Sequence, residues 1–150
     1  MSRVCVSVRT GAAIYVFAED HCPPHIHARH RGEGWIARVE FSFVTNEVRL
    51  ISVTPVRNIP LPRVIGQLLD DVQDALHACR AEWWAMRGMT CLTNRWAVRE
   101  RQSLTLPPEH RPDAMQVEKA DYNPVNHCLR IVFKGGATFV MEAGSGIEPV

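Results

Sequence analysis

The 150-residue sequence has no excess of charge of either sign and no long apolar run. Its 17 basic and 16 acidic residues give a formal charge of +1, so the composition lacks a bulk signal for nucleic acid and leaves only a local basic patch open. No apolar run approaches the roughly 18 residues that a bilayer span requires. The residues after Met1 alternate in polarity and lack the apolar segment of a signal peptide. A membrane partner is therefore not expected.

The cysteines are few and are not paired in sequence. There are five, an odd number, and no two form a C-x-x-C motif. This pattern argues against a disulfide framework or a thiolate zinc cage, and it fits a reducing compartment. Together with 46% hydrophobic and 22% charged residues, it predicts a globular protein of the cytoplasm.

Histidine, in contrast, is concentrated in one place. Four of the seven histidines lie in the stretch Asp20-His21-Cys22-Pro23-Pro24-His25-Ile26-His27 and at His30, just after it. The two prolines stiffen the backbone, because each fixes φ at about −65° and lacks an N–H donor. If a strand begins at His25, the side chains of His25, His27 and Arg29 share one of its faces.

The pattern of the first half predicts a β-meander of about five strands. Alternating or continuous apolar residues are separated by turn residues, as in half-buried and buried strands. The expected strands cover residues 4–8, 12–18, 25–30, 35–43 and 47–53. After the proline-rich residues 55–62, apolar side chains recur at threes and fours and predict one long helix over about 62–86. Gly88 is a suitable C-terminal cap for that helix.

The second half predicts a small C-terminal β unit. Residues 106–114 are rich in proline and read as a linker, which separates a first domain of residues 1–105 from residues 115–150. Three short strands follow, and Gly135-Gly136 is a hairpin signal between the last two. The predicted class is α+β: an antiparallel meander covered by one helix, with a three-stranded unit after it. Since three short strands are marginal alone, this unit is expected to pack on the first domain, on a partner or on a second copy.

The residues of the first half resemble the bacterial domain-of-unknown-function family 4160 over about residues 13–87. The resemblance rests on an apolar strand that ends in an acidic residue, on the signature His21-x-Pro23-Pro24-His25-x-His27, and on a helix with Trp83 and Trp84 in its last turn. Residues 115–143 are similar to family 2442, through Asp121-Tyr122 and the run from Leu129 to Gly136. The resemblance implies a fused toxin–antitoxin-type module, with a toxin-like first domain and a docking or neutralising C-terminal unit.

Three interpretations of the histidine stretch stay open. His21, His25 and His27, together with Asp20, suit a divalent transition metal, and such a site makes a metal-binding domain or a metal-dependent hydrolase. Alternatively, His25 and His27 act as base and acid, with Arg29 or Arg31 binding a phosphate, and cleave RNA without a metal. In the third interpretation the stretch is a structural turn, with one bond before Pro23 or Pro24 in the cis form, in a plain protein-interaction module.

The densest basic run lies beside Trp96 in the second half. The run consists of Arg95, Arg99, Arg101 and Arg111. It forms either a solvated face or a phosphate-contacting patch for RNA or DNA, with Arg95, Arg99 and Arg101 as the candidate contacts.

Overall fold

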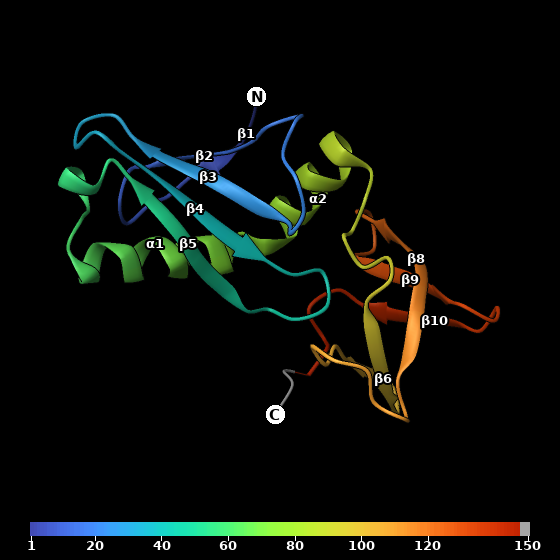
Figure 1. Ribbon diagram of the computed structural model, residues 1–150. Helices are drawn as coiled ribbons and strands as arrows, with labels where there is room; N and C mark the ends of the chain where they lie inside the picture. The colour runs from blue at the N-terminus through green and yellow to red at the C-terminus, as the bar shows by residue number, and fades with distance from the viewer. Residues whose placement is uncertain (148–150) are drawn as a thin grey trace. The chain divides into compact units, whose positions relative to one another are not determined.

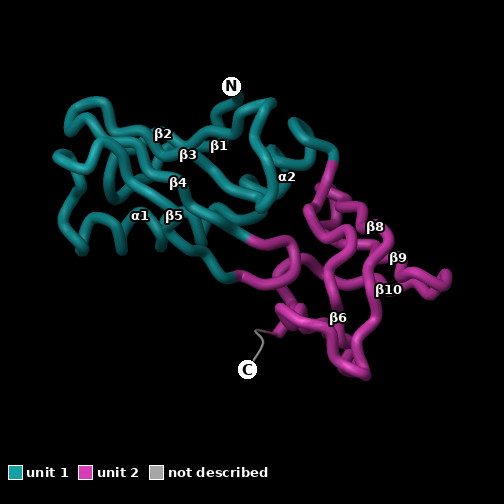
Figure 2. Tube along the Cα trace, in the orientation of Figure 1, with its two compact units in different colours: residues 1–41, 47–88 teal, residues 42–46, 89–150 magenta. Residues whose placement is uncertain are grey.

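The computed structural model describes residues 1–147, which form two compact units (Figure 2). Unit 1 consists of Met1–Phe41 and Glu47–Gly88, and unit 2 consists of Ser42–Asn46 and the chain from Met89 onward. Each unit contains an antiparallel sheet of five strands, and both α-helices of the described residues belong to unit 1. The predicted α+β class is therefore confirmed. Among the described residues, no helix is both long and apolar enough to cross a membrane.

The sheet of unit 1 is the predicted meander, with neighbouring strands in chain order (Figure 1). Its strands are β1 (Ser2–Val6), β2 (Ala13–Val16), β3 (His25–His30), β4 (Trp35–Phe41) and β5 (Val48–Thr54). The faces follow the period of two. Ile26 and Ala28 of β3 are fully buried and pair with Val39 and Ala37 of β4. His27 and Arg29, which alternate with these residues along β3, point to the opposite face.

Two helices cover the apolar face of this sheet, where the sequence predicted one helix over 62–86. Helix α1 (Pro62–Asp74) lies along β5, and α2 (Leu76–Arg87) lies along β1 and β2 (Figure 1). Ala75 separates them with φ −104° and ψ 16°. The Ala75 N–H still bonds to the Asp71 carbonyl, and its own carbonyl accepts from Cys79. No proline or glycine lies at this break, and the helical spacing of apolar residues continues through it. The sequence therefore predicted a single helix. Gly88 is the predicted C-terminal cap, with φ 62°.

The sheet of unit 2 has five strands where three were predicted. Its order is β10–β9–β8–β6–β7. Strands β8 (Met115–Asn123), β9 (Cys128–Phe133) and β10 (Thr138–Glu142) are the predicted meander. Strands β6 (Trp96–Glu100) and β7 (Ser103–Thr105) precede it, and β6 pairs with β8. Residues 106–114 therefore connect two strands inside unit 2, and the division between compact units falls after Gly88. The pairing of β6 with β8 assigns these residues to unit 2, and it joins segments that are distant in sequence.

A short segment between β4 and β5 belongs to unit 2. Gly144 N–H donates to the Phe43 carbonyl and Gly146 N–H to the Val44 carbonyl, at 3.1 and 2.7 Å. Phe43 and Val44 are buried, and the Phe43 ring lies edge-on to Tyr122 at 5.0 Å between centroids. Unit 2 therefore draws on two separate stretches of chain, and no single cut separates the units.

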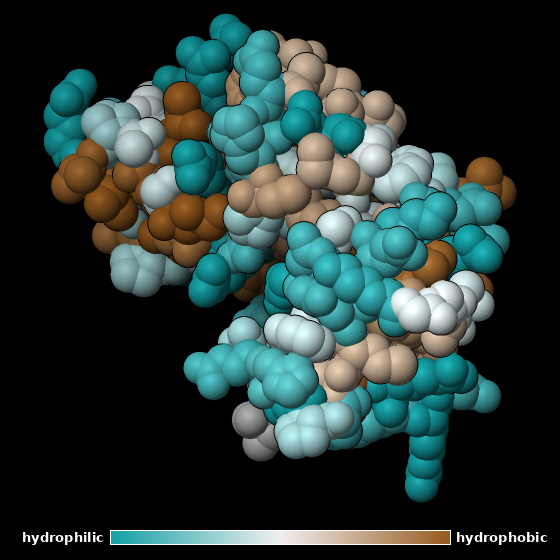
Figure 3. All heavy atoms as spheres, turned by 45° about the vertical axis from the view of Figure 1, so that its right-hand side comes forward, coloured by the Kyte–Doolittle hydropathy of each residue, from teal (hydrophilic) through white to brown (hydrophobic). Residues whose placement is uncertain are grey.

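Exposed apolar side chains gather in the connection between β5 and α1. Val56, in the 3₁₀ turn η1 (Val56–Asn58), and Ile59 and Leu61, which follow it, are exposed. Figure 3 shows an apolar patch on the left of its view, where this end of unit 1 lies. In unit 2, Val140 on the edge strand β10 is also exposed. The predicted self-association through the C-terminal unit stays a prediction.

Asp71 of α1 forms hydrogen bonds to the turn between β1 and β2. Its carboxylate accepts from Ser7 Oγ at 2.6 Å, from Arg9 N at 2.8 Å and from the Arg9 guanidinium. Burial alone raises the pKa of Asp71, but these hydrogen bonds and the Arg9 charge together hold it below its ordinary value of 3.8. The ionised form is thus favoured in the folded protein.

We expect Asp71→Asn to lower the free energy of unfolding by about 1–3 kcal/mol at pH 7, the range for hydrogen bonds to a charged group. Because the folded pKa is the lower one, the carboxylate stabilises the fold fully above pH 3.8 and loses this effect as the pH falls through the folded pKa. Urea denaturation at pH 7, 5 and 3 measures the difference, with the exposed Asp70→Asn as control. A difference that stays constant down to pH 3 contradicts this assignment.

Gly146 permits the close approach of three segments in unit 2. A Cβ atom there would lie 2.4 Å from Val44 Cγ1, 2.7 Å from the Val44 carbonyl oxygen and 2.9 Å from the Leu104 carbonyl oxygen. Gly146→Ala should therefore destabilise the protein by about 1–3 kcal/mol, the usual effect of overpacking. Gly66→Ala, in α1 with open space around it, should stabilise by about 0.5–1 kcal/mol. Thermal denaturation of both variants checks this, and a Gly146→Ala protein as stable as wild type refutes it.

Candidate metal centre

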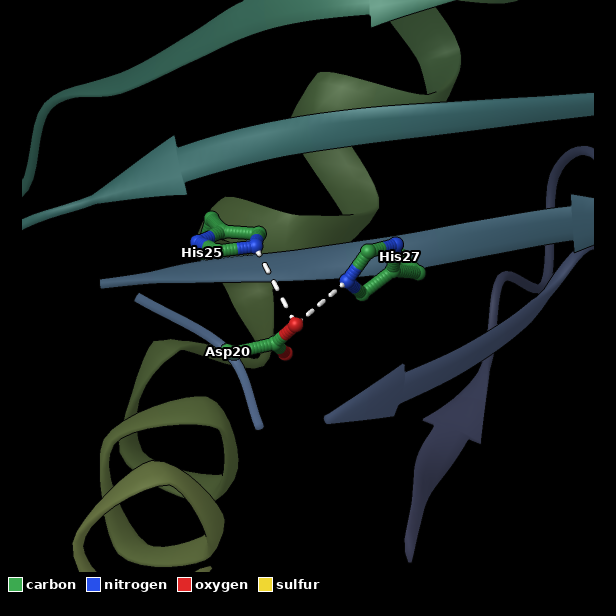
Figure 4. A group of neighbouring side chains, drawn as sticks. All are labelled: Asp20, His25 and His27. Atoms are coloured by element: carbon green, nitrogen blue, oxygen red, sulfur yellow. Dashed lines mark hydrogen bonds and ion pairs between the residues drawn. The ribbon is translucent and has the colours of Figure 1, made fainter. Parts of the chain in front are cut away.

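Three side chains of the predicted stretch meet at one point: Asp20, His25 and His27 (Figure 4). Asp20 lies in the connection between β2 and β3, and the two histidines lie on β3. One potential ligand atom from each residue lies within 4.8 Å of the others. The period of two in β3 places both imidazoles on the same face, and the turn at Pro23 and Pro24 returns the chain so that Asp20 faces them. The Cys22–Pro23 bond is cis, as one interpretation of the sequence expected.

The Asp20 carboxylate connects the group. Its Oδ1 lies 3.0 Å from His27 Nε2 and 3.5 Å from His25 Nε2. Its Oδ2 accepts a hydrogen bond from the Phe17 backbone N–H at 2.9 Å. The side chains of Asp20, His25 and His27 are only 10%, 8% and 16% exposed. A carboxylate that has lost this much water requires a positive partner, because burial without one is costly.

The hydrogen bond of His25 to the backbone shows which of its ring nitrogens carries the proton and which one faces Asp20. Its Nδ1 lies 2.9 Å from the Pro23 carbonyl oxygen, which can only accept, so Nδ1 carries the proton. In the neutral ring, Nε2 then presents a lone pair toward Asp20 Oδ1. Two electron-rich atoms 3.5 Å apart are stabilised by a positive centre beside both, which is either a second proton on the ring or a metal ion.

Aromatic rings hold the two imidazoles in place. Trp83 of α2 lies against His25 with 5.5 Å between ring centroids, and Phe17 meets His27 edge-on at 4.6 Å. The imidazoles themselves are 5.1 Å apart by the same measure. Packing of this kind restricts the orientations that the two imidazole rings can adopt.

The two distances from Asp20 Oδ1 to the imidazole nitrogens can be compared with those between the ligands of a transition metal. With metal–ligand bonds of about 2.0–2.2 Å, two ligand atoms lie about 3.4 Å apart in a tetrahedral shell and about 3 Å apart in an octahedral one. The distance from Asp20 Oδ1 to His25 Nε2, 3.5 Å, is close to the tetrahedral value, and the distance to His27 Nε2, 3.0 Å, is close to the octahedral value and is also that of a hydrogen bond.

The structure differs from the predicted ligand set at one position. His21 is exposed and lies outside the group, whereas Asp20, which the sequence offered only as an additional ligand, is central to it. Cys22, next to them, is disulfide-bonded and offers no free thiolate. That state does not match the reduced cysteines that the sequence pattern predicts, and the cytoplasmic location stays a prediction.

The other predicted site residues lie elsewhere. Arg29 is on the same face of β3 but is exposed and outside the group of three. Arg95, Arg99 and Arg101 are all exposed in unit 2. Arg99 lies over the Phe139 ring at 4.6 Å and lines a cavity of about 540 Å³ whose lining includes neither Arg95 nor Arg101. The three arginines do not converge on one pocket.

Comparison with known proteins adds no assignment. No family model matches the chain, and the searches of curated proteins and of solved structures find no similar protein. The resemblances to families 4160 and 2442 therefore stay expectations from the sequence.

Proposed function

We propose that unit 1 is a metal-binding domain that holds one divalent transition metal ion through Asp20, His25 and His27. The observation that carries the proposal is the orientation of His25: its Nδ1 is committed to the Pro23 carbonyl, and its Nε2 faces the carboxylate that also meets His27. A ligand histidine typically donates its other ring nitrogen to a carbonyl or carboxylate, as His25 does here.

The donor set selects the class of ion. Two imidazole nitrogens and one carboxylate oxygen suit zinc, iron(II) and similar ions, whereas magnesium and calcium prefer shells of oxygen. Three protein ligands also leave at least one coordination position for water. That arrangement is typical of hydrolytic rather than purely structural zinc sites. A metal-dependent hydrolase is therefore the activity that such a centre favours.

Metal titration of the untagged, chelator-treated protein tests the proposal. We expect one zinc ion to bind per chain and to raise the melting temperature, since an ion present at 100 times its Kd adds about 2.7 kcal/mol to the free energy of unfolding. His25→Ala and His27→Gln should abolish the rise. Asp20→Asn should weaken it while keeping an acceptor for the Phe17 N–H. His21→Ala, an exposed histidine of the same loop, is the matched control.

The structural interpretation gives a different result. If the group is only a hydrogen-bonded turn, the same substitutions lower the melting temperature of the metal-free protein, and neither zinc nor a chelator changes it in wild type. Metal-free wild type with a melting temperature indifferent to zinc, iron(II) and chelator contradicts the proposal and favours the plain interaction module.

The toxin–antitoxin-type function is a second proposal, drawn from the resemblance. What supports it in the fold is the presence of two compact units, each with its own sheet. A truncated protein that tests this proposal still contains Ser42–Asn46, which belongs to unit 2. Removing the chain after Gly88 takes away the strands that bury Phe43 and Val44. A truncation at 88 should therefore carry Phe43→Ser and Val44→Ser to remain soluble.

We expect this truncated protein to slow bacterial growth more than the full chain does, at equal soluble amounts, because the C-terminal unit would no longer neutralise the first. Growth curves after induction measure the effect. Equal growth of cells that hold equal soluble amounts of both proteins removes the toxin–antitoxin proposal.

A further inference from the structure

A polar cavity lies in unit 1, outside the group of Asp20, His25 and His27. It has a volume of about 270 Å³ and is lined by residues of β1, β2, β3 and the adjoining turns: Arg3, Gly11, Ala13, Tyr15, Arg29, His30, Arg31 and Gly32. The turn after β1 and the turn after β3 come together here because Ala13 of β2 pairs with Arg29 of β3. No carboxylate is among the lining residues.

Three arginines of this lining have no acidic partner. Arg3, Arg29 and Arg31 make no ion pair within residues 1–147. Arg3 instead lies over the Tyr15 ring, with its guanidinium carbon 6.0 Å from the ring centroid. Elsewhere in unit 1, Arg49 is paired with Glu40. Three like charges around one cavity repel each other, and a bound anion removes that repulsion.

His30 adds a fixed donor to the same lining. Its Nδ1 accepts a hydrogen bond from the Glu33 backbone N–H at 3.0 Å, so the ring proton is on Nε2. The ring stacks on Trp35 at 5.4 Å, which holds its orientation. Gly11 and Gly32 leave space beside it: a Cβ on Gly32 would come within 3.3 Å of His30 Cε1, and one on Gly11 within 3.9 Å of Nε2.

We propose that this cavity binds the dianionic phosphate group of a phosphate monoester. Arginine presents hydrogen-bond donors in a planar fork that matches phosphate oxygens, and charge-assisted bonds of this kind are the strong ones. A monoester carries a charge of about −1.5 to −2 at neutral pH, which suits several cations better than a diester does. The volume lies below the range of about 300–1,000 Å³ for whole small molecules, so the cavity takes the phosphate group and leaves the rest of the ligand outside.

This inference does not depend on the metal centre, because the lining shares no residue with Asp20, His25 and His27. The two sites nevertheless lie on the same sheet face, since Tyr15 pairs with His27. The same phosphate chemistry occurs in small phosphorylated molecules and at the 5′ end of a processed nucleic acid.

Calorimetry and fluorescence anisotropy on the full chain, in chelator and in a buffer without phosphate, test the proposal. The probes are inorganic phosphate, a nucleoside 5′-monophosphate with its nucleoside, and one oligonucleotide with and without a 5′-phosphate. We expect binding only where the terminal phosphate is present. Tighter binding of the phosphorylated oligonucleotide than of the mononucleotide assigns the nucleic-acid end as source, and equal binding assigns a small molecule.

Substitutions locate the site. Arg29→Gln and Arg31→Gln should each weaken phosphate binding about tenfold, the effect of losing one charge-assisted hydrogen bond. Arg63→Gln, an exposed arginine on α1, makes the same change in net charge and should leave binding unchanged. Melting temperatures of all three variants should match wild type, because these side chains are exposed. Equal loss in Arg63→Gln, binding of the oligonucleotide regardless of its 5′-phosphate, or no binding of any phosphate probe overturns the inference.

Discussion

The alternation of side chains along β3 is the constraint on which both the core and the candidate sites of unit 1 depend. Ile26 and Ala28 are fully buried on the face that the helices cover, while His27 and Arg29 belong to the other face. His25, the first residue of β3, is buried beside Trp83 of α2. Strands β2 and β4 pair with β3 on both sides and fix its register. A slip of one residue would exchange the faces, placing the polar side chains of His27 and Arg29 in the core and the apolar side chains in water. The register that buries this core therefore also sets the orientation of His27 toward Asp20.

The Asp20 carboxylate has two roles, one in the local fold and one in the candidate site. One oxygen accepts from the Phe17 N–H and holds the connection between β2 and β3, while the other faces both imidazoles. A mostly buried carboxylate is tolerated only beside positive charge. A metal ion would satisfy this requirement and the lone pair of His25 Nε2 at the same time, and so would a second proton on the His25 ring.

The near-zero net charge conceals how unevenly charge is distributed. A formal charge of +1 gives no sign of the three unpaired arginines around one cavity. Those arginines come from β1, the end of β3 and the following turn, and only strand pairing brings them together. Composition reports the sum of the charges, whereas binding depends on their local arrangement.

Much of the fold could be predicted from local patterns, because burial of one face imposes a period of two on a strand and about 3.6 on a helix. The five strands of unit 1, the helical stretch after Pro62, its end at Gly88 and the meander β8–β10 all follow from such patterns. The sequence also pointed to His25 and His27 on a shared face. What only the tertiary structure decided depends on contacts between distant residues. These are the pairing of β6 with β8, the inclusion of Ser42–Asn46 in unit 2, and the choice of Asp20 over His21. Local periodicity shows which face of a strand or helix is buried. It does not show which element packs against that face, because this depends on the packing of the whole chain.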